Sequence, residues 1–258
     1  MLRRPALLAK AVLSMNIVMP VIAALIAVTF ALPIEVKVAL AALAVSPVPP
    51  ILYKKQLKVG GQMNYVVGLL VAMSLLAVIF VPLTIAIVNH FFDVNAALSP
   101  ATVAKIMVTS ALAPLLVGLV IRQLFPVTEK AASVVAKVAG TLLVVGVVPL
   151  LIKLWPELKP FLGDGTLLVM IALAAVGLLV GHLLGGPNAA DRTTLALSTA
   201  SRHPAVALAV ATSGTSVDAV GAKPALALIL RYVVVAALVS IPYQKWRERN
   251  EAASGTPR

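Results

Sequence analysis

Residues 198–213 read STASRHPAVALAVATS. Arg202, His203 and Pro204 follow one another here inside a run of small and apolar residues that suits a lipid bilayer. A charge at membrane depth costs free energy and usually marks a function, while a proline removes a backbone donor and leaves a carbonyl free. Irregular backbone is tolerated at that depth only where protein or a water-filled cavity surrounds it. The segment therefore predicts a membrane helix that is broken around a site.

The composition of the whole chain is that of a protein with several membrane spans. Apolar residues occupy 61% and charged residues 12% of the 258 positions, and the mean hydropathy is +1.05, whereas soluble domains are roughly half apolar and a quarter charged. The net charge of +12 is scattered over loops and ends, so we expect a lipid bilayer and no nucleic acid as partner. No cysteine is present, which excludes disulfides and thiolate metal sites. We expect no metal and no other cofactor.

Eight segments are candidates to cross the hydrocarbon, which needs about 20 apolar residues per helix. The predicted fold class is therefore an all-α polytopic membrane protein. Six spans are expected to be continuous, and two are interrupted by proline. The expected spans are 7–32, a second from 34 that is interrupted at 46–50, 63–88, 103–124, 131–154, 166–184, 190–213 with its break near Pro204, and 220–243.

The order of these spans indicates an internal repeat. A continuous, an interrupted and a continuous span occur at the start and again at the end, at an odd offset that inverts the second copy. Paired interrupted segments in two inverted halves indicate a transporter site. We therefore predict four units: 1–100 as first-repeat core helices with a crossover at 46–58, 101–160 as panel helices, 161–247 as second-repeat core helices with a crossover at 198–213, and 248–258 as a cytoplasmic tail.

The basic residues indicate the orientation, because cytoplasmic loops carry an excess of Lys and Arg. With the N-terminus inside, most basic loop residues fall on one side, and few fall on the other. We therefore expect a bacterial inner (plasma) membrane protein with both termini in the cytoplasm. The residues on the expected cytoplasmic side are Arg3, Arg4, Lys10, Lys54, Lys55, Lys58, Arg122, Lys130, Arg192, Lys245, Arg247 and Arg249.

The first interruption reads SPVPP over residues 46–50. Ser46, Pro47, Pro49 and Pro50 cannot lie in a continuous helix, because each proline removes a donor and restricts the residue before it. One interpretation is a plain loop between two short helices. The other, which we favour because the lysines at 54, 55 and 58 mark the membrane exit, is an unwound crossover whose free carbonyls face substrate.

Three basic residues within the expected spans are candidates for the second half of the site. Arg202 either lies at the midplane as a fixed positive charge or snorkels to a surface. His203 is either a hydrogen-bonded structural residue or a group that titrates near neutral pH and couples protons. Arg231, near the middle of the last span, belongs to the pathway or forms a structural bridge to a backbone carbonyl.

Acidic residues are absent from the interior of every expected span, because all nine Asp and Glu residues fall in loops or at span ends. With positive charges inside and no carboxylate to neutralise sodium, the interior suits an anion better than a cation. The sequence also lacks the HExxH, Walker A and GxGxxG motifs of common enzymes. We therefore expect no enzymatic activity.

Several of these segments resemble the bile acid:sodium symporter family. Residues 16–20, NIVMP, which begin at Asn16, are similar to the third helix of that family, and residues 32–35 and 46–47 are similar to the approach to its first crossover. Residues 201–208, SRHPAVAL, which begin at Ser201, are similar to its second crossover. The resemblance implies two broken helices that cross near the midplane, and alternating access between a core and a panel.

Two departures from the family pattern bear on function. The family typically has ten spans, and this chain starts at the equivalent of the third. Either the lineage lacks the first two, or the start is misplaced, or another chain supplies them. In addition, positions that bind sodium in the family correspond here to Leu52, Tyr53, Val66, Leu70 and Ser198, and its Gln-Asn pair corresponds to Arg202 and His203. The resemblance thus implies dismantled sodium sites, with Arg202 as a built-in cation.

Together these observations predict a secondary active transporter of small organic anions that does not depend on sodium. Its expected pathway residues are Asn16, Ser46, Pro47, Pro49, Pro50, Ser198, Ser201, Arg202, His203, Pro204 and Arg231, and protons are a candidate coupling ion. One alternative is efflux of an oxyanion of the arsenite type, which the lack of cysteine disfavours. The other alternative is a sensor or truncated remnant that does not transport.

Overall fold

In a computed structural model, residues 4–92, 99–124, 129–161, 165–213 and 221–254 are described, and their regular secondary structure is helical. Five helical segments are long and apolar enough to cross a membrane: Pro5–Thr29, Met63–Ile87, Pro100–Ile121, Thr166–Leu184 and Ala222–Glu251. The 25-residue helix α8 (Glu129–Lys153) and two broken helices correspond to the other three predicted spans. The protein is thus an all-α polytopic membrane protein.

Two of the continuous spans contain a short π-helical segment near their middle. The first consists of α1 (Pro5–Val12), η1 (Leu13–Val18) and α2 (Met19–Thr29). The other consists of α6 (Pro100–Met107), η2 (Val108–Leu112) and α7 (Ala113–Leu124). Such segments are rare and occur frequently at functional sites, because the extra residue per turn shifts the side chains that follow.

Both interrupted spans break where prolines were expected to break them. Helix α3 (Ile34–Val45) is separated by residues 46–51 from α4 (Leu52–Lys58), and α11 (Ala189–Ala200) is separated by residues 201–203 from α12 (Pro204–Ala211). In each break the residue before a proline is extended, with ψ of 144° at Ser46 and 108° at His203. Steric contact with the proline ring disfavours helical backbone at that position.

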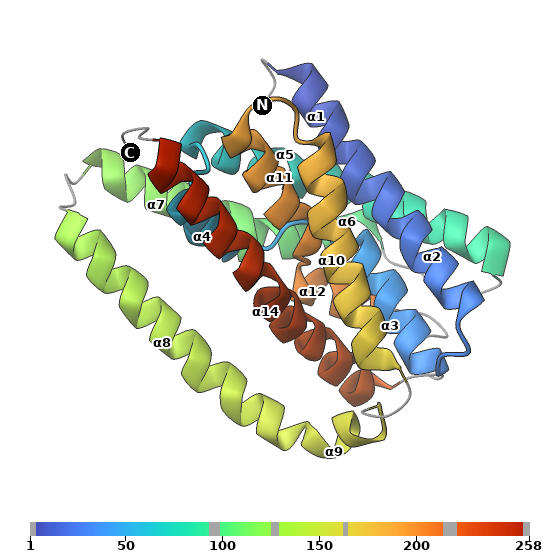
Figure 1. The fold of residues 1–258 in the computed structure, drawn as a ribbon. Helices are drawn as coiled ribbons and strands as arrows, with labels where there is room; N and C mark the ends of the chain where they lie inside the picture. The colour runs from blue at the N-terminus through green and yellow to red at the C-terminus, as the bar shows by residue number, and fades with distance from the viewer. Residues whose placement is uncertain (1–3, 93–98, 125–128, 162–164, 214–220, 255–258) are drawn as a thin grey trace.

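The halves of the two broken helices exchange partners in the core. Helix α3 packs against α12, and α4 packs against α11. The continuous helices α5 (Met63–Phe92), α10 (Thr166–Leu184) and α14 (Ala222–Ser254) enclose them (Figure 1). The two larger clusters of buried apolar side chains lie on either side of the crossing, and a small third cluster joins α9 to α14. The inverted repeat expected from the order of the spans stays a prediction.

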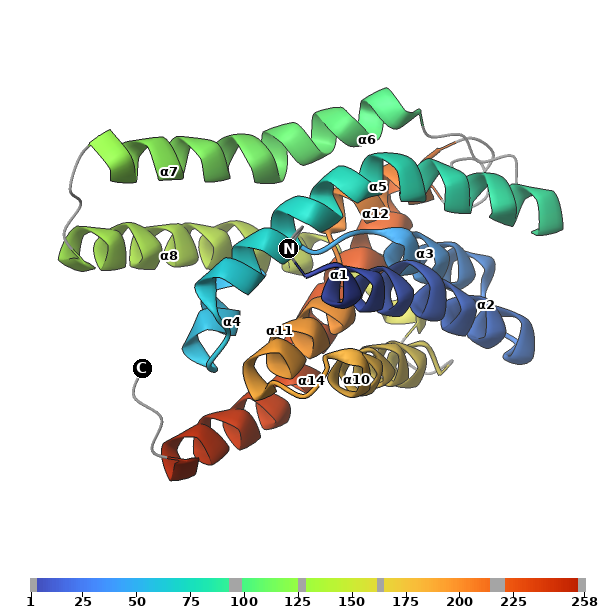
Figure 2. The same cartoon turned by 90° about the horizontal axis from the view of Figure 1, so that it is seen from above.

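The span α6–η2–α7 and helix α8 lie along one edge of the molecule, apart from α10 and α11 (Figure 2). A short helix, α9 (Trp155–Leu158), and the turn η3 (Lys159–Phe161) follow α8. Helix α14 runs to Ser254, so residues 248–254 of the expected cytoplasmic tail are helical.

Helix α11 is held by unusually close packing on α10. Gly177 and Gly181 lie one turn apart on the contact face of α10, and a Cβ atom on Gly181 would lie 2.5 Å from the Cα of Ala196. Small residues at this spacing allow helix backbones in a membrane to approach. Glycine is therefore required at this position to place α11, which ends at the second break.

We expect Gly181→Leu to lower the free energy of unfolding by about 1–3 kcal/mol or more, because the side chain would enter a filled contact. The measurement is thermal unfolding of the detergent-solubilised protein. Gly146→Leu in α8 is the matched control, since a Cβ there meets no described atom within 4 Å. Equal melting temperatures for the two variants would contradict the proposed packing role.

Candidate functional site

The two breaks meet through hydrogen bonds that join one broken helix to the other. The amide N–H of His203 donates to the carbonyl oxygen of Pro47 at 2.9 Å, and Nη1 of Arg202 donates to the carbonyl oxygen of Ser46 at 3.2 Å. Both acceptors are carbonyls that leave the helical hydrogen-bond pattern where α3 ends. The free carbonyls predicted from the prolines are thus the groups that join the crossovers.

Arg202 lies in the interior of the protein, with 2% of its surface exposed. The alternative that it snorkels to a membrane surface is therefore wrong. Tyr232 on α14 closes the site beside it, and its hydroxyl donates to the carbonyl oxygen of Ala200 at 2.8 Å. Among the described residues Arg202 makes no ion pair, and its Nε and Nη2 have no hydrogen-bond partner.

His203 is also buried, with 4% exposure, but it faces a different element. Its Nε2 lies 3.1 Å from the hydroxyl oxygen of Ser110, which belongs to the π-helical segment η2. Neighbouring side chains in extended backbone point to opposite sides. This alternation explains why Arg202 lies beside α14 while His203 contacts the α6–η2–α7 span.

The proline-rich first break is buried in the protein. Ser46, Pro47 and Pro49 are all buried, and the Ser46 hydroxyl donates to the carbonyl oxygen of Leu43 at 2.8 Å. Pro50 is half-buried, and the chain becomes exposed at Lys54 and Lys55 beyond it. That the chain leaves the membrane at this point stays a prediction.

A buried amide, which the sequence interpretation missed, ties the outer halves of the crossovers together. Gln56 on α4 is 3% exposed, and its Nε2 donates to the Thr194 carbonyl oxygen at 2.9 Å and to the Ser198 hydroxyl at 2.7 Å. The surrounding lysines made this stretch look solvated. Only the spacing of the residues could have indicated that Gln56 is buried, because Lys54, Lys55 and Lys58 are exposed and Gln56 lies on the opposite face of the helical turn.

The remaining predicted residues lie around the crossing with different degrees of contact. Asn16 is half-buried in η1, where its Nδ2 has no partner among the described residues, and its neighbour Ser14 lies 3.2 Å from the Thr199 hydroxyl of α11. Ser201 and Pro204 are half-buried in the second break. Arg231 is buried on α14, next to the tyrosine that closes the Arg202 site.

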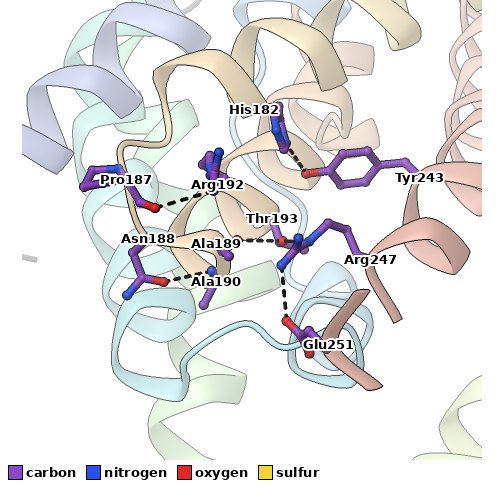
Figure 3. A network of polar contacts seen from close by, with 10 residues as sticks. All are labelled: His182, Pro187, Asn188, Ala189, Ala190, Arg192, Thr193, Tyr243, Arg247 and Glu251. Atoms are coloured by element: carbon purple, nitrogen blue, oxygen red, sulfur yellow. Dashed lines mark hydrogen bonds and ion pairs between the residues drawn. The ribbon is translucent and has the colours of Figure 1, made fainter. Parts of the chain in front are cut away.

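At the end of the bundle where α14 finishes, a polar network fixes the start of α11 (Figure 3). Arg247 is 6% exposed, and its Nε donates to the Thr193 hydroxyl at 2.6 Å while its Nη2 pairs with Glu251. His182 of α10 lies 2.8 Å from the Tyr243 hydroxyl. His182 thus lies in the last turn of its span.

Asp191 shows how an acidic residue at a helix end is nevertheless buried. It lies in the first turn of α11 with 3% exposure, and Arg4 pairs with it at 3.2 Å. A carboxylate near a helix N-terminus is favoured by the helix dipole. The pair therefore joins the beginning of the chain to the second crossover.

We expect Gln56→Met to lower the free energy of unfolding by about 1–3 kcal/mol, because two buried hydrogen bonds are lost and the Ser198 hydroxyl loses a donor. Thermal unfolding measures the change, and Gln62→Met, at an exposed position before α5, is the control. A Gln56 variant as stable as the Gln62 variant would show that the cross-link contributes nothing.

Comparison with known proteins identifies the family from the first part of the chain. The model of the sodium bile acid symporter family matches residues 1–154, which is 154 of the 258 residues. A search of curated proteins finds no match. The matched part includes α3, the first break and α4, and the second break packs against it as described above. The chain belongs to the sodium bile acid symporter family, a family of membrane transporters.

Proposed function

We propose that this protein carries small organic anions across a bacterial inner membrane by alternating access, without sodium. The observation that carries the proposal is a buried guanidinium at the meeting point of the two breaks, bonded to a backbone carbonyl of the opposite repeat. Oxygen atoms of this kind are the groups that unwound transporter helices offer to a sodium ion. Arg202 supplies a permanent positive charge to the same type of ligand.

The residues around the first crossover also support independence from sodium. Leu52, Val66 and Leu70 offer no oxygen in their side chains, and all three are buried. The Ser198 hydroxyl, at the position where the family resemblance implies a glutamate, accepts a hydrogen bond from Gln56. The polar side chains are hydrogen-bonded to each other and the others are apolar, so these residues offer few oxygen ligands to a cation.

The charge balance of the crossing favours an anionic substrate. In the described part of the chain Arg202 has two nitrogen atoms without hydrogen-bond partners and no carboxylate in an ion pair. A buried cation in that state is costly, and an anion that reaches it removes part of the cost. In our proposal the cation both holds the crossovers together and attracts the substrate.

The two parts that would move are the units expected from the sequence. In the proposal, residues 1–100 and 161–247 form the core, and residues 101–160 form the panel that rocks against it. Arg4–Asp191 and Lys58–Glu248 pairs support a core that moves as one body, because they link α1, α4, α11 and α14. His203, bonded to Ser110 of the panel, is the candidate for coupling protons.

The proposed orientation puts both termini in the cytoplasm. Helix α1 begins and α14 ends at the same end of the bundle (Figure 1). The contacts of Arg4, Lys58 and Arg247 bring the basic end of α4, the start of α11 and the end of α14 to this same end. A concentration of basic residues at one end is typical of the cytoplasmic side.

Flux measurements in proteoliposomes test the sodium proposal. We expect anion uptake to stay within about twofold of its starting rate when sodium is replaced by potassium, a change that corresponds to only about 0.4 kcal/mol. A set of labelled organic anions is screened first to obtain a transported substrate. Uptake that requires sodium would contradict the proposal.

The role of Arg202 is tested with a second pair of variants. We expect Arg202→Ala to reduce uptake by about tenfold or more, because a charge-assisted hydrogen bond is worth about 1.5–3 kcal/mol. Arg249→Ala, which removes an exposed arginine from the end of α14, is the control. Wild-type uptake in a folded Arg202→Ala protein would show that this cation has no part in transport.

A further inference from the structure

The Ser110 hydroxyl makes two contacts but has one hydrogen to donate. Its oxygen lies 2.5 Å from the carbonyl oxygen of Ile106 and 3.1 Å from Nε2 of His203. A carbonyl only accepts hydrogen bonds, so the short contact with Ile106 must use the serine hydrogen. Ser110 can then only accept from His203, and Nε2 of the imidazole must carry a hydrogen.

The opposite ring nitrogen is left as an acceptor when the imidazole is neutral. A neutral histidine carries one N–H, and the other nitrogen has a free lone pair. Nδ1 of His203 is buried and has no hydrogen-bond partner among the described residues. An unfilled acceptor in a buried position is costly, so this atom is suited to accept a hydrogen bond or a proton from a species that enters the interface.

The charges around His203 favour the neutral ring at rest. Arg202 precedes it in the chain, and in the described residues no carboxylate forms an ion pair with either side chain. A second buried positive charge without a counter-charge is unfavourable. On α3 and α6, which pack around the break, the charged groups are Glu35, Lys37 and Lys105. On α14 the charged and titratable groups are Lys223, Arg231 and Tyr232, followed toward the end of the helix, beside the start of α11, by Tyr243, Lys245, Arg247, Glu248, Arg249 and Glu251.

The hydrogen bond between Ser110 and His203 joins two different parts of the protein. Ser110 belongs to a π-helical segment, and such segments are frequent at functional sites. His203 belongs to the second break, and α12 packs against α6 there. The hydrogen bond therefore joins the two units that rock against each other in the proposed mechanism, and relative motion of these units changes the environment of the imidazole.

We infer that Ser110 is a positioning residue that holds His203 in the Nε2–H tautomer, so that the coupled proton enters at Nδ1 and leaves from the same atom. This inference rests on the proposed transport function for its purpose but not for its geometry. On proton uptake from water the Nδ1 lone pair forms an N–H bond and the ring becomes an imidazolium. Release of that proton on the other side restores the neutral ring.

Nitrogen-15 NMR of the histidine side chains tests the tautomer directly. The chain has three histidines, so His90→Gln and His182→Gln leave the His203 ring as the single labelled signal. Protonated and bare ring nitrogens differ in chemical shift, and their couplings to the ring protons identify Nδ1 and Nε2. We expect the Nε2–H tautomer in this background, and a resting Nδ1–H tautomer would overturn the inference.

Substitutions at Ser110 separate positioning from mere packing. We expect Ser110→Ala to produce a mixture of tautomers, whereas Ser110→Thr, which keeps the hydroxyl, retains the Nε2–H form. Thr109→Val is the matched control, because the Thr109 hydroxyl bonds only to carbonyls of its own helix at Lys105 and Ile106. An unchanged tautomer in Ser110→Ala would overturn the inference.

The pH dependence of uptake is measured in the same variants. We expect Ser110→Ala to shift the pH at which uptake is half-maximal, with Ser110→Thr and Thr109→Val keeping the profile of the parent protein. Identical profiles for Ser110→Ala and the parent would contradict a role in proton coupling. The NMR result does not depend on any flux, so a failure of the transport proposal and a failure of the tautomer assignment remain distinguishable.

Discussion

The contact between the two proline-broken segments is the constraint on which the rest of the structure depends. His203 donates its amide to Pro47, and Arg202 donates its guanidinium to Ser46. These bonds exist because prolines end the helical pattern and leave carbonyl oxygens exposed at a depth where water is scarce. A membrane interior requires that such groups find partners, and here each break supplies the partners of the other.

The close approach of α11 to its neighbours follows from that constraint. Glycines on α10 bring its backbone against α11. Gln56 of α4 binds the backbone of α11, and two residues in the first turns of α11, Asp191 and Thr193, bind arginines from the two ends of the chain. Without these contacts the second break would not reach the first. The small residues and the hydroxyls near the crossing therefore have a structural role that is separate from any contact with substrate.

The side chains of Arg202 and His203 lie against different parts of the protein. In the sequence they form one basic pair, but the Arg202 side chain interacts with Tyr232 of α14, whereas the His203 ring lies 3.1 Å from Ser110 of η2. Arg202 joins the two breaks, whereas His203 contacts the α6–η2–α7 span. In the proposed function, this separation assigns substrate attraction to the fixed charge and proton coupling to the titratable ring.

The amino-acid order was sufficient for the helical class and the two breaks, because hydropathy and proline are local properties of the chain. It left open whether Arg202 is buried or reaches a membrane surface. It did not indicate Gln56 or Ser110, whose polarity has a purpose only through Ser198 and His203, more than ninety positions away in each case. Nor did it reveal that Asp191 is buried at a helix end. Which side chains meet, and which atom of an imidazole remains free to accept a proton, depends on packing between distant segments, and only the folded arrangement decides it.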